Sequence, residues 1–200
     1  MKLFGIFLIL LIVVSVFGRK KSKMNKKIFL RGQMPQDFHI DSNTIKESDE
    51  IEDRFTPQGA DINPDFFWDN NSVPAGTKSF AFSVEDPDAP YEPFYHWLVI
   101  NIPRETYRID RNSVPGEQVT NSWGLTKYRG PSPPKGKTHR YVFRLFALSA
   151  DIIKVKSPKV FMHAMKRFKL GEASIMGIYR KGGILKNKEE VINDDEENNE

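Results

Sequence analysis

Three long segments of strand-forming residues constrain the fold of this chain more than any other feature. Residues 78–86, 95–102 and 139–148 are rich in aromatic and branched apolar side chains, and a fourth segment, 173–180, resembles them. The first and third segments alternate with period two, which is typical of strands and places alternate side chains on one face. The alternating positions are Phe80, Phe82 and Val84 in the first segment and His139, Tyr141, Phe143, Leu145 and Ala147 in the third. The second segment is almost continuously apolar, as expected of a strand covered on both faces.

Residues 157–170 carry the clearest helical pattern. Ser157 is suited to the N-cap, Pro158 to the first helical position and Gly171 to the position after the end. One apolar stripe at helical spacing is formed by Phe161, Ala164, Met165 and Phe168. His163 and Lys166 lie off this stripe and are expected to face water. The sequence therefore predicts a mainly β domain with one late helix.

Cysteine is absent from the 200 residues, which excludes disulfides, thiolate catalysis and cysteine-ligated zinc. The formal net charge of +4 is unevenly distributed along the chain. Residues 1–27 carry seven Lys or Arg and no acid, and residues 186–200 carry two Lys against seven Asp or Glu, so residues 28–185 carry only +2. The basic pI therefore reflects an N-terminal arm, and no nucleic-acid-binding face is expected.

The apolar N-terminus points to export or to a membrane. Residues 3–17 are almost purely apolar, which is short of the roughly 20 residues of a membrane span but suits the core of a secretory signal. We expect a signal peptide at residues 1–18 and a basic arm at 19–27, ahead of a folded domain at 28–185. The alternative is an uncleaved anchor. The protein is thus expected to be secreted or otherwise extracytoplasmic, or else membrane-anchored.

The sequence also contains an acidic C-terminal run and one possible glycosylation site. Residues 186–200 form a dense acidic run without apolar periodicity, which predicts a disordered, solubilising tail. Asn70, Asn71 and Ser72 form a glycosylation sequon, which has meaning only in a eukaryotic secretory route.

The stretch GPSPPKGKTHRY at residues 130–141 superficially resembles a P-loop. A P-loop needs four residues between its first glycine and the Gly-Lys-Ser/Thr, whereas five separate Gly130 from Gly136. Three of those five are prolines, which have no N–H to offer a phosphate. A strand follows rather than a helix, so no helix N-terminus is available for an anion. The nucleotide-site interpretation is therefore rejected.

Polar residues at the expected strand ends form the best candidate site. Asp86 and Asp88 end the first strand, His96 lies near the start of the second and His139 near the start of the third. A rigid sheet can present such groups at one rim. The competing interpretation is a turn at residues 86–90 and two histidines satisfied within the sheet. A hydrolase would use His96 or His139 as a base, but no Gly-x-Ser-x-Gly elbow is present. No short histidine spacing supports a metal site either.

Taken together, SVEDPDAP, FYHWLVINIP and GPSPPKGKTHRYVFRLFAL resemble, in order and spacing, the phosphatidylethanolamine-binding protein family, which includes the Raf kinase inhibitor-like proteins. The resemblance covers about residues 51–181, and the short link between DPDAP and the histidine is similar to the compact bacterial and archaeal form. It implies a large antiparallel sheet packed with a smaller sheet, and an anion pocket at one rim. Carried over position by position, the pocket residues are Asp86, Asp88, Ala89, Pro90, His96, Gly130, Ser132, Pro133, His139 and Tyr141.

The resemblance also implies what these residues do. Histidines and backbone N–H groups would donate to phosphate oxygens, and of the two carboxylates one would orient a histidine while the other meets an ammonium group. A C-terminal tyrosine touches the pocket in many members, but that role is not assigned to Tyr179 here. Ser132 stands where many members have Cys or another small residue, and it adds a hydroxyl.

We therefore expect a non-catalytic protein that binds an anion or a phosphoethanolamine-like phospholipid headgroup, without cofactor or metal. The family resemblance allows inhibition of a serine protease or a kinase. The alternative is a small hydrolase of phosphorylated or acylated molecules that uses His96, His139 and Asp86. Expected partners are a phosphate-containing small molecule or headgroup, and a membrane through the N-terminal segment, but no nucleic acid.

Overall fold

A computed structural model describes residues 37–90 and 93–182. The expected signal peptide, the basic arm and the acidic tail lie outside the described residues. Within those residues the elements in chain order are η1 (Asp53–Phe55), β1 (Phe66–Phe67), η2 (Asn70–Ser72), β2 (Ser79–Asp86), β3 (Phe94–Pro103), β4 (Arg108–Ile109), β5 (Glu117–Val119), β6 (Thr138–Leu148), α1 (Pro158–Phe168) and β7 (Lys169–Arg180).

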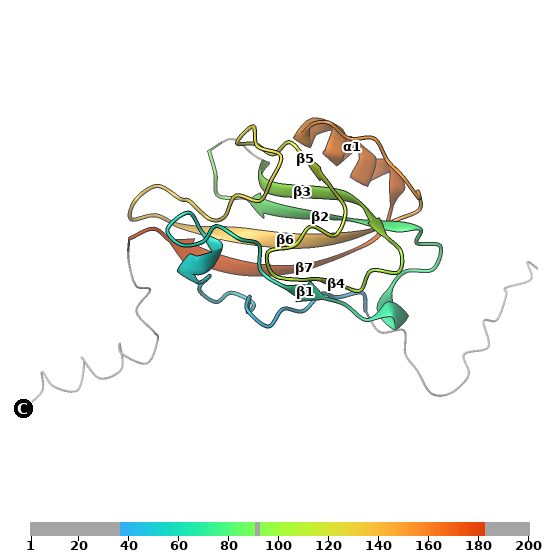
Figure 1. Cartoon of the computed structure of the whole chain (residues 1–200), viewed down its shortest axis with the longest axis horizontal. Helices are drawn as coiled ribbons and strands as arrows, with labels where there is room; N and C mark the ends of the chain where they lie inside the picture. The colour runs from blue at the N-terminus through green and yellow to red at the C-terminus, as the bar shows by residue number, and fades with distance from the viewer. Residues whose placement is uncertain (1–36, 91–92, 183–200) are drawn as a thin grey trace, which may run out of the picture. The chain divides into compact units, whose positions relative to one another are not determined.

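Five strands form one antiparallel sheet in the order β5-β3-β2-β6-β7 (Figure 1). The three strongest sequence segments form strands, as the pattern predicts, and they are the three central strands of this sheet. A second, two-stranded sheet pairs β1 with β4. The mainly β architecture with a larger and a smaller antiparallel sheet and one helix is confirmed.

The two faces of the large sheet carry separate apolar clusters. On β2, Phe80, Phe82 and Val84 belong to one cluster and Ala81 to the other, which is the alternation that period two requires. The first cluster continues through Phe143 on β6 and packs against the N-terminal segments and the small sheet. The second cluster packs under α1. The central strands are therefore buried on both faces.

Asn101 interrupts the alternation of β3. Its backbone adopts a left-handed conformation with φ of 56°, and the pairing with β2 shifts register between Phe80 and Phe82. The extra residue is a β-bulge, and it returns Ile102 to the same apolar cluster as Val99. The Asn101 side chain also accepts a 2.8 Å hydrogen bond from the backbone N–H of Ile153, which fixes the segment that leads to α1.

Most of the predicted features of the helix are confirmed. The Ser157 side chain accepts a hydrogen bond from the backbone N–H of Val160, and Pro158 begins the helix. Phe161 and Met165 are buried, Ala164 and Phe168 are partly buried against the same cluster, and His163 and Lys166 are exposed.

The predicted helix terminator is wrong, because Gly171 does not cap α1. The helix passes directly into β7 at Lys169, and Gly171 lies inside that strand. A Cβ at Gly171 would come within 2.5 Å of the Pro74 Cγ. Glycine is therefore required there by close packing rather than by a helix end.

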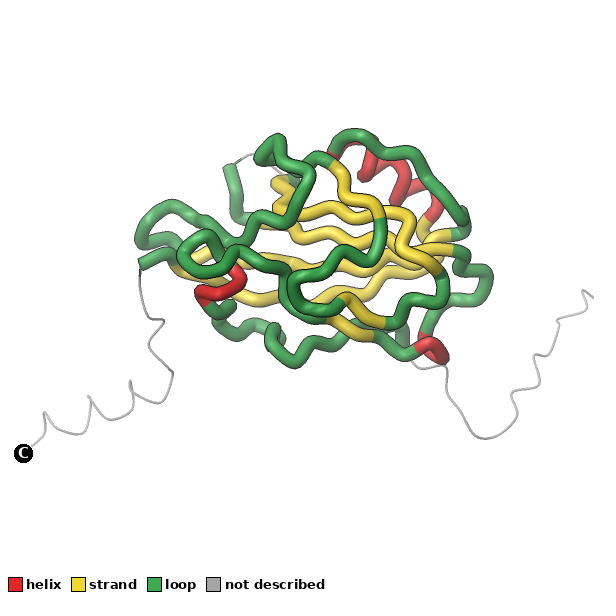
Figure 2. Tube along the Cα trace, viewed as in Figure 1, coloured by secondary structure: helices red, strands yellow, loops and turns green. Residues whose placement is uncertain are grey.

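Loops connect the strands at both ends of the sheet (Figure 2). In the described part of the chain, no helix has the length and apolar character needed to cross a membrane. The sequon residue Asn70 is exposed at the start of η2, whereas Ser72 is buried.

Candidate functional site

Three strand ends meet at one rim of the large sheet. The end of β2 lies beside the starts of β3 and β6, because both of these strands run antiparallel to β2 (Figure 1). A cavity of about 160 Å³ opens at this rim. Among the described residues it is lined by Asp86, Ala89, Pro90, Phe94, His96, Trp123, Ser132, Pro133, Pro134 and His139.

The cavity brings together most of the residues that the family resemblance implied. Seven of the ten line it: Asp86, Ala89, Pro90, His96, Ser132, Pro133 and His139. The other three, Asp88, Gly130 and Tyr141, are not among its lining residues. Sequence reasoning did not identify Phe94, Trp123 or Pro134 as lining residues.

His139 and Asp86 form a buried pair at the cavity. Asp86 Oδ2 lies 2.8 Å from His139 Nδ1, and the side chains retain only 5% and 11% of their exposure. Because a carboxylate can only accept, Nδ1 carries the proton and donates. Asp86 Oδ1 accepts a 2.9 Å hydrogen bond from the backbone N–H of Asp88. Asp86 is thereby fixed, and the His139 Nε2 is left for a ligand.

His96 is held by backbone carbonyls rather than by a carboxylate. Its Nδ1 lies 2.8 Å from the carbonyl oxygen of Arg129 and 3.0 Å from that of Gly130. Carbonyls only accept, so Nδ1 is the protonated nitrogen. Burial lowers the pKa of the imidazole below its ordinary value, although these carbonyls act in the opposite direction. A neutral His96 therefore presents Nε2 as an acceptor, which differs from the expected donor role.

Tyr141 lies behind the histidines with an unsatisfied hydroxyl. The side chain is fully buried, and its ring packs edge-on against His96 with centroids 5.2 Å apart. The hydroxyl lies near Asp86 and the backbone of Ser132, but it makes no well-formed hydrogen bond within the described residues. Burial raises the pKa of the phenol, so it stays protonated. The Tyr141 hydroxyl is thus a weakly engaged donor behind the lining residues, close to Asp86 and to the backbone of Ser132.

Asp88 does not share the cavity, contrary to the implied role. Its carboxylate accepts hydrogen bonds from the Arg140 guanidinium at 2.7 and 3.0 Å and from the Arg140 backbone N–H at 2.8 Å. The side-chain hydrogen bond from Arg140 lowers the pKa of Asp88. Because its oxygens are engaged by Arg140 outside the cavity, Asp88 supports the rim rather than meeting a ligand.

Gly130 also supports the site instead of lining it. Its backbone N–H donates to Asp61 Oδ1 at 2.8 Å. A Cβ at this position would lie 1.9 Å from the backbone oxygen of Phe55, and the Tyr128 hydroxyl donates to that same oxygen at 2.8 Å. Only glycine allows the loop to approach so closely, and this approach positions the carbonyls that hold His96.

Aromatic side chains form the mouth of the cavity. Trp123 packs edge-on against Phe94 and His96, with centroids 5.4 and 5.9 Å away, and keeps 43% of its exposure. The Arg129 guanidinium lies 5.6 Å from the Trp123 ring. The buried Asn121 shapes this loop, since its side chain accepts from the Trp123 backbone N–H and donates to the His96 carbonyl. A lone tryptophan in a polar loop was the available signal.

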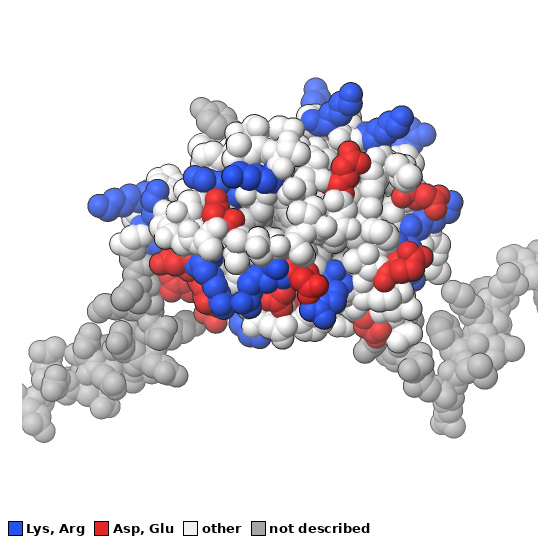
Figure 3. Space-filling model, viewed as in Figure 1, with Lys and Arg blue, Asp and Glu red and all other residues white. Residues whose placement is uncertain are grey.

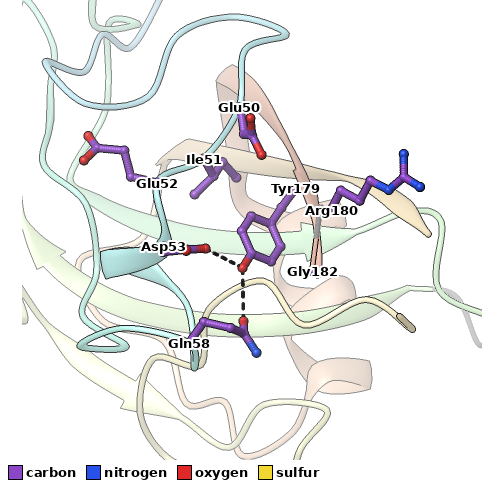
Figure 4. Close-up of a pocket in the computed structure, with 8 residues that line it drawn as sticks. All are labelled: Glu50, Ile51, Glu52, Asp53, Gln58, Tyr179, Arg180 and Gly182. Carbon is purple, nitrogen blue, oxygen red and sulfur yellow. Dashed lines mark hydrogen bonds between the residues drawn. The ribbon is translucent and has the colours of Figure 1, made fainter. Parts of the chain in front are cut away.

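Tyr179 belongs to a separate and larger cavity of about 670 Å³ (Figure 4). Its hydroxyl donates to Asp53 Oδ1 at 2.7 Å and lies 3.2 Å from Gln58 Oε1. Glu50 and Glu52 also line this cavity. Tyr179 pairs directly with His139 across β6 and β7, but its hydroxyl is committed to the acidic cavity. It does not line the rim cavity.

The charge in the rim cavity is small. No Lys or Arg lines it among the described residues, so the side chains that can donate into it are those of histidine, serine and tryptophan. No three His, Asp or Glu side chains within residues 37–90 and 93–182 are placed to hold a metal ion. The arrangement suits hydrogen bonding to a small, partly protonated anion.

Comparison with known proteins matches residues 41–180 to the family model described as phosphatidylethanolamine-binding protein. A UPF0098 protein of Methanothermobacter thermautotrophicus is 36% identical over 154 residues, which cover 72% of this chain and all of the relative. The UPF0098 protein YbhB of Escherichia coli is 38% identical over 128 residues, covering 57% of this chain and 80% of the relative.

Solved structures show the same similarity. The crystal structure of Escherichia coli YbcL, described as a member of the mammalian PEBP family, superposes with a TM-score of 0.68 at 31% identity. It covers 72% of this chain and 98% of YbcL. CT736 of Chlamydia trachomatis, described as a phosphatidylethanolamine-binding protein homologue, gives a TM-score of 0.66 at 26% identity, with the same coverage of both chains.

Proposed function

This chain belongs to the phosphatidylethanolamine-binding protein family, and from this premise we propose that its rim cavity binds a small phosphate-bearing anion, such as a phosphoethanolamine headgroup, without catalysing a reaction. The cavity volume of about 160 Å³ is below the roughly 300–1,000 Å³ of sites for drug-sized ligands. A headgroup fits this size better than an entire lipid.

The observation that carries the proposal is the pair of histidines, His96 and His139, that line one small cavity and whose Nε2 atoms make no hydrogen bond within the described residues. His139 has its Nδ1 bound to Asp86, so a protonated His139 donates through Nε2. The buried Tyr141 hydroxyl has no well-formed partner in the described residues. An unpaired buried donor is costly, but Tyr141 is not a lining residue of the cavity, so a ligand oxygen would satisfy it only by reaching deeper than the lining side chains.

His96 requires that the ligand carry a hydrogen-bond donor. Since its neutral Nε2 accepts, it pairs with a ligand group that carries hydrogen, either a protonated phosphate oxygen or an ammonium. Phosphate monoesters change from the dianion to the singly protonated monoanion near pH 6. Asp86, moreover, repels a bare dianion unless His139 is protonated. We therefore expect binding to strengthen as the pH falls from 8 toward 5.5.

Isothermal titration calorimetry on the full chain tests the proposal, with inorganic phosphate and phosphoethanolamine titrated separately at pH 5.5 and 8. Tighter binding of phosphoethanolamine would identify a headgroup, and equal binding a free phosphate. His139→Ala should weaken binding at least tenfold, since it removes a lining side chain whose Nε2 is unengaged. The matched control is His163→Ala on the exposed face of α1. Absence of binding by the wild type across pH 5–8 would refute the proposal.

The hydrogen bond between His139 and Asp86 favours one alternative, a hydrolase in which His139 or His96 acts as a base. Incubation with p-nitrophenyl phosphate and p-nitrophenyl acetate separates the two candidates. Turnover that His96→Ala abolishes would replace the binding proposal with the enzymatic one. A lack of turnover together with measurable phosphate binding would support the binding proposal.

We extend the proposal to location and target. The apolar segment at residues 3–17 supports secretion or membrane anchoring, and N-terminal sequencing of the mature protein distinguishes the two. An extracytoplasmic protein would encounter a serine protease or a lipid rather than a cytosolic kinase. Inhibition of a serine protease panel by the wild type but not by His139→Ala would support an inhibitory role for the cavity.

A further inference from the structure

Residues 151–168 form a layer that covers one face of the large sheet. Its inward side chains, Ile153, Val155, Phe161 and Met165, are buried in the apolar cluster beneath. The Asn101 side chain fixes the start of this layer by two hydrogen bonds. Its Oδ1 accepts from the Ile153 N–H at 2.8 Å, and its Nδ2 donates to the Ile153 carbonyl oxygen at 3.1 Å. Side chains that do not face the sheet must therefore face solvent on the same side of the domain.

The outward side chains of this layer are mostly cationic. We use the term basic face for Ile152, Lys154, Lys156, Lys159, Val160, Lys166 and Arg167, all of which are exposed. On α1, residues 159, 160, 163, 166 and 167 fall on the arc opposite Phe161 and Met165 at helical spacing. Figure 3 shows Lys and Arg side chains gathered at the upper right, over α1.

Fixed acidic partners are absent from this surface within the described residues. None of its five cations takes part in a salt bridge there, and the adjacent Asp151 is paired with Lys78 at 3.1 Å. The neighbouring Lys169 is paired with Glu172 at 2.6 Å. Five cations held on one rigid surface without counter-charges produce a local positive potential.

We propose that the basic face docks the domain on an anionic phospholipid surface. Each Lys or Arg near such a surface strengthens binding about fivefold, so five cations together provide substantial affinity. Two exposed aliphatic side chains lie among them: Ile152 keeps 74% of its exposure and Val160 keeps 43%. Aliphatic side chains between lysines suit the boundary between headgroups and acyl chains.

The composition favours a lipid surface over other polyanions. Nucleic-acid surfaces use arginine and stacked aromatic side chains, whereas four of the five cations of this face are lysines, and its one arginine, Arg167, already lies over the partly buried Phe168 ring at 5.1 Å. An acidic protein would match the charge, but it would leave Ile152 without an apolar environment. The proposal is also independent of the rim cavity, because none of the residues of the basic face lines that cavity.

A labelled cysteine tests which surface meets the lipid, and the absence of native cysteine makes single labelling clean. Ile152→Cys carries an environment-sensitive dye, and Val114→Cys, 48% exposed in the wild type and outside the basic face, is the control. Vesicles of phosphatidylcholine and phosphatidylserine at 3:1 should shift the emission of the first label to the blue but not that of the second. Bound protein with an unshifted label at 152 would overturn the proposal, even if the N-terminal segment tethers the chain.

Charge variants of the full chain give a second test. Lys159→Gln with Lys166→Gln should lower the binding to 3:1 vesicles by about 25-fold relative to wild type, from about fivefold for each cation. The control, Lys127→Gln with Lys137→Gln, removes equal charge from exposed positions elsewhere and should change binding less than threefold. Equal losses in both pairs would show that only net charge matters and would refute a docking face. Stronger capture by polyglutamate than by vesicles would indicate an acidic protein instead.

Discussion

Replacing Tyr141 by phenylalanine should stabilise the ligand-free protein and weaken its ligand binding. The hydroxyl is buried, and it makes no well-formed hydrogen bond within the described residues. An unsatisfied buried polar group costs about 1–3 kcal/mol, and the weak contacts with Asp86 and Ser132 offset part of this cost. We expect a net gain of about 1 kcal/mol in unfolding free energy. For a domain of this size that raises the Tm by about 2–4 °C.

The same substitution also removes a donor to any ligand that reaches past the lining residues to the Tyr141 hydroxyl. A hydrogen bond to a charged group contributes about 1.5–3 kcal/mol, so Tyr141→Phe should weaken phosphate binding by about tenfold or more. Thermal unfolding without ligand and calorimetric titration with phosphate measure the two effects separately. Stability and binding should therefore change in opposite directions in one variant.

Tyr128 provides the matched control. Its hydroxyl is also buried, but it donates to the backbone oxygen of Phe55 at 2.8 Å. Tyr128→Phe should lower the unfolding free energy by about 1–3 kcal/mol, because that carbonyl loses its donor. If Tyr141→Phe destabilised the protein as much as Tyr128→Phe, the Tyr141 hydroxyl would have a structural partner and the reasoning would fail.

Three other predictions concern the support of the site. Gly130→Ala should cost about 3 kcal/mol or more, because the added Cβ would lie 1.9 Å from the Phe55 oxygen; urea unfolding measures this, and a loss under 1 kcal/mol would contradict it. Burial lowers the pKa of His96, so below pH about 6.5 the unfolded chain binds a proton that the folded chain does not, and stability should fall. His96→Asn should flatten the Tm between pH 6.5 and 4.5, and an unchanged slope would contradict this. Asp88→Asn should change the unfolding free energy by about 1 kcal/mol at most and the phosphate affinity less than twofold, because the Asp88 carboxylate binds Arg140. A tenfold loss of phosphate affinity would show instead that Asp88 contacts the ligand.

The strands of the large sheet were predictable because their alternation extends over many residues, whereas the strands of the small sheet are too short to show a pattern. Residues 139–148 alternate over a full strand, so their faces could be assigned before the structure. In contrast, β1 and β4 have two residues each, which is too short to show any period. Their position depends on burial of Phe66 and Ile109 against the sheet, which is a tertiary effect. Gly171 shows the same limit, because packing against Pro74 rather than local turn chemistry requires it.

Part of the candidate site was likewise predictable from the sequence, and part was not. Family motifs located the residues at the strand ends, because antiparallel pairing brings the end of β2 beside the starts of β3 and β6. They did not show that Arg140 engages Asp88, since that contact depends on side-chain direction. Trp123 reaches the cavity through a loop that Asn121 organises by hydrogen bonds. A lone tryptophan in a polar loop draws attention to the residue, but it does not show what the side chain contacts.

The loop that precedes β6 is tightly packed at Gly130 and unpacked at Gly136. This difference identifies a place where sequence can be inserted. Gly130 is wedged against Phe55, whereas at Gly136 an added Cβ would meet no atom within 4 Å. Surface tips of this kind accept inserted sequence more readily than buried segments do. Because Pro133 and Pro134 line the cavity just before this tip, a reporter inserted at Gly136 would sit beside the ligand without replacing any residue that holds His96.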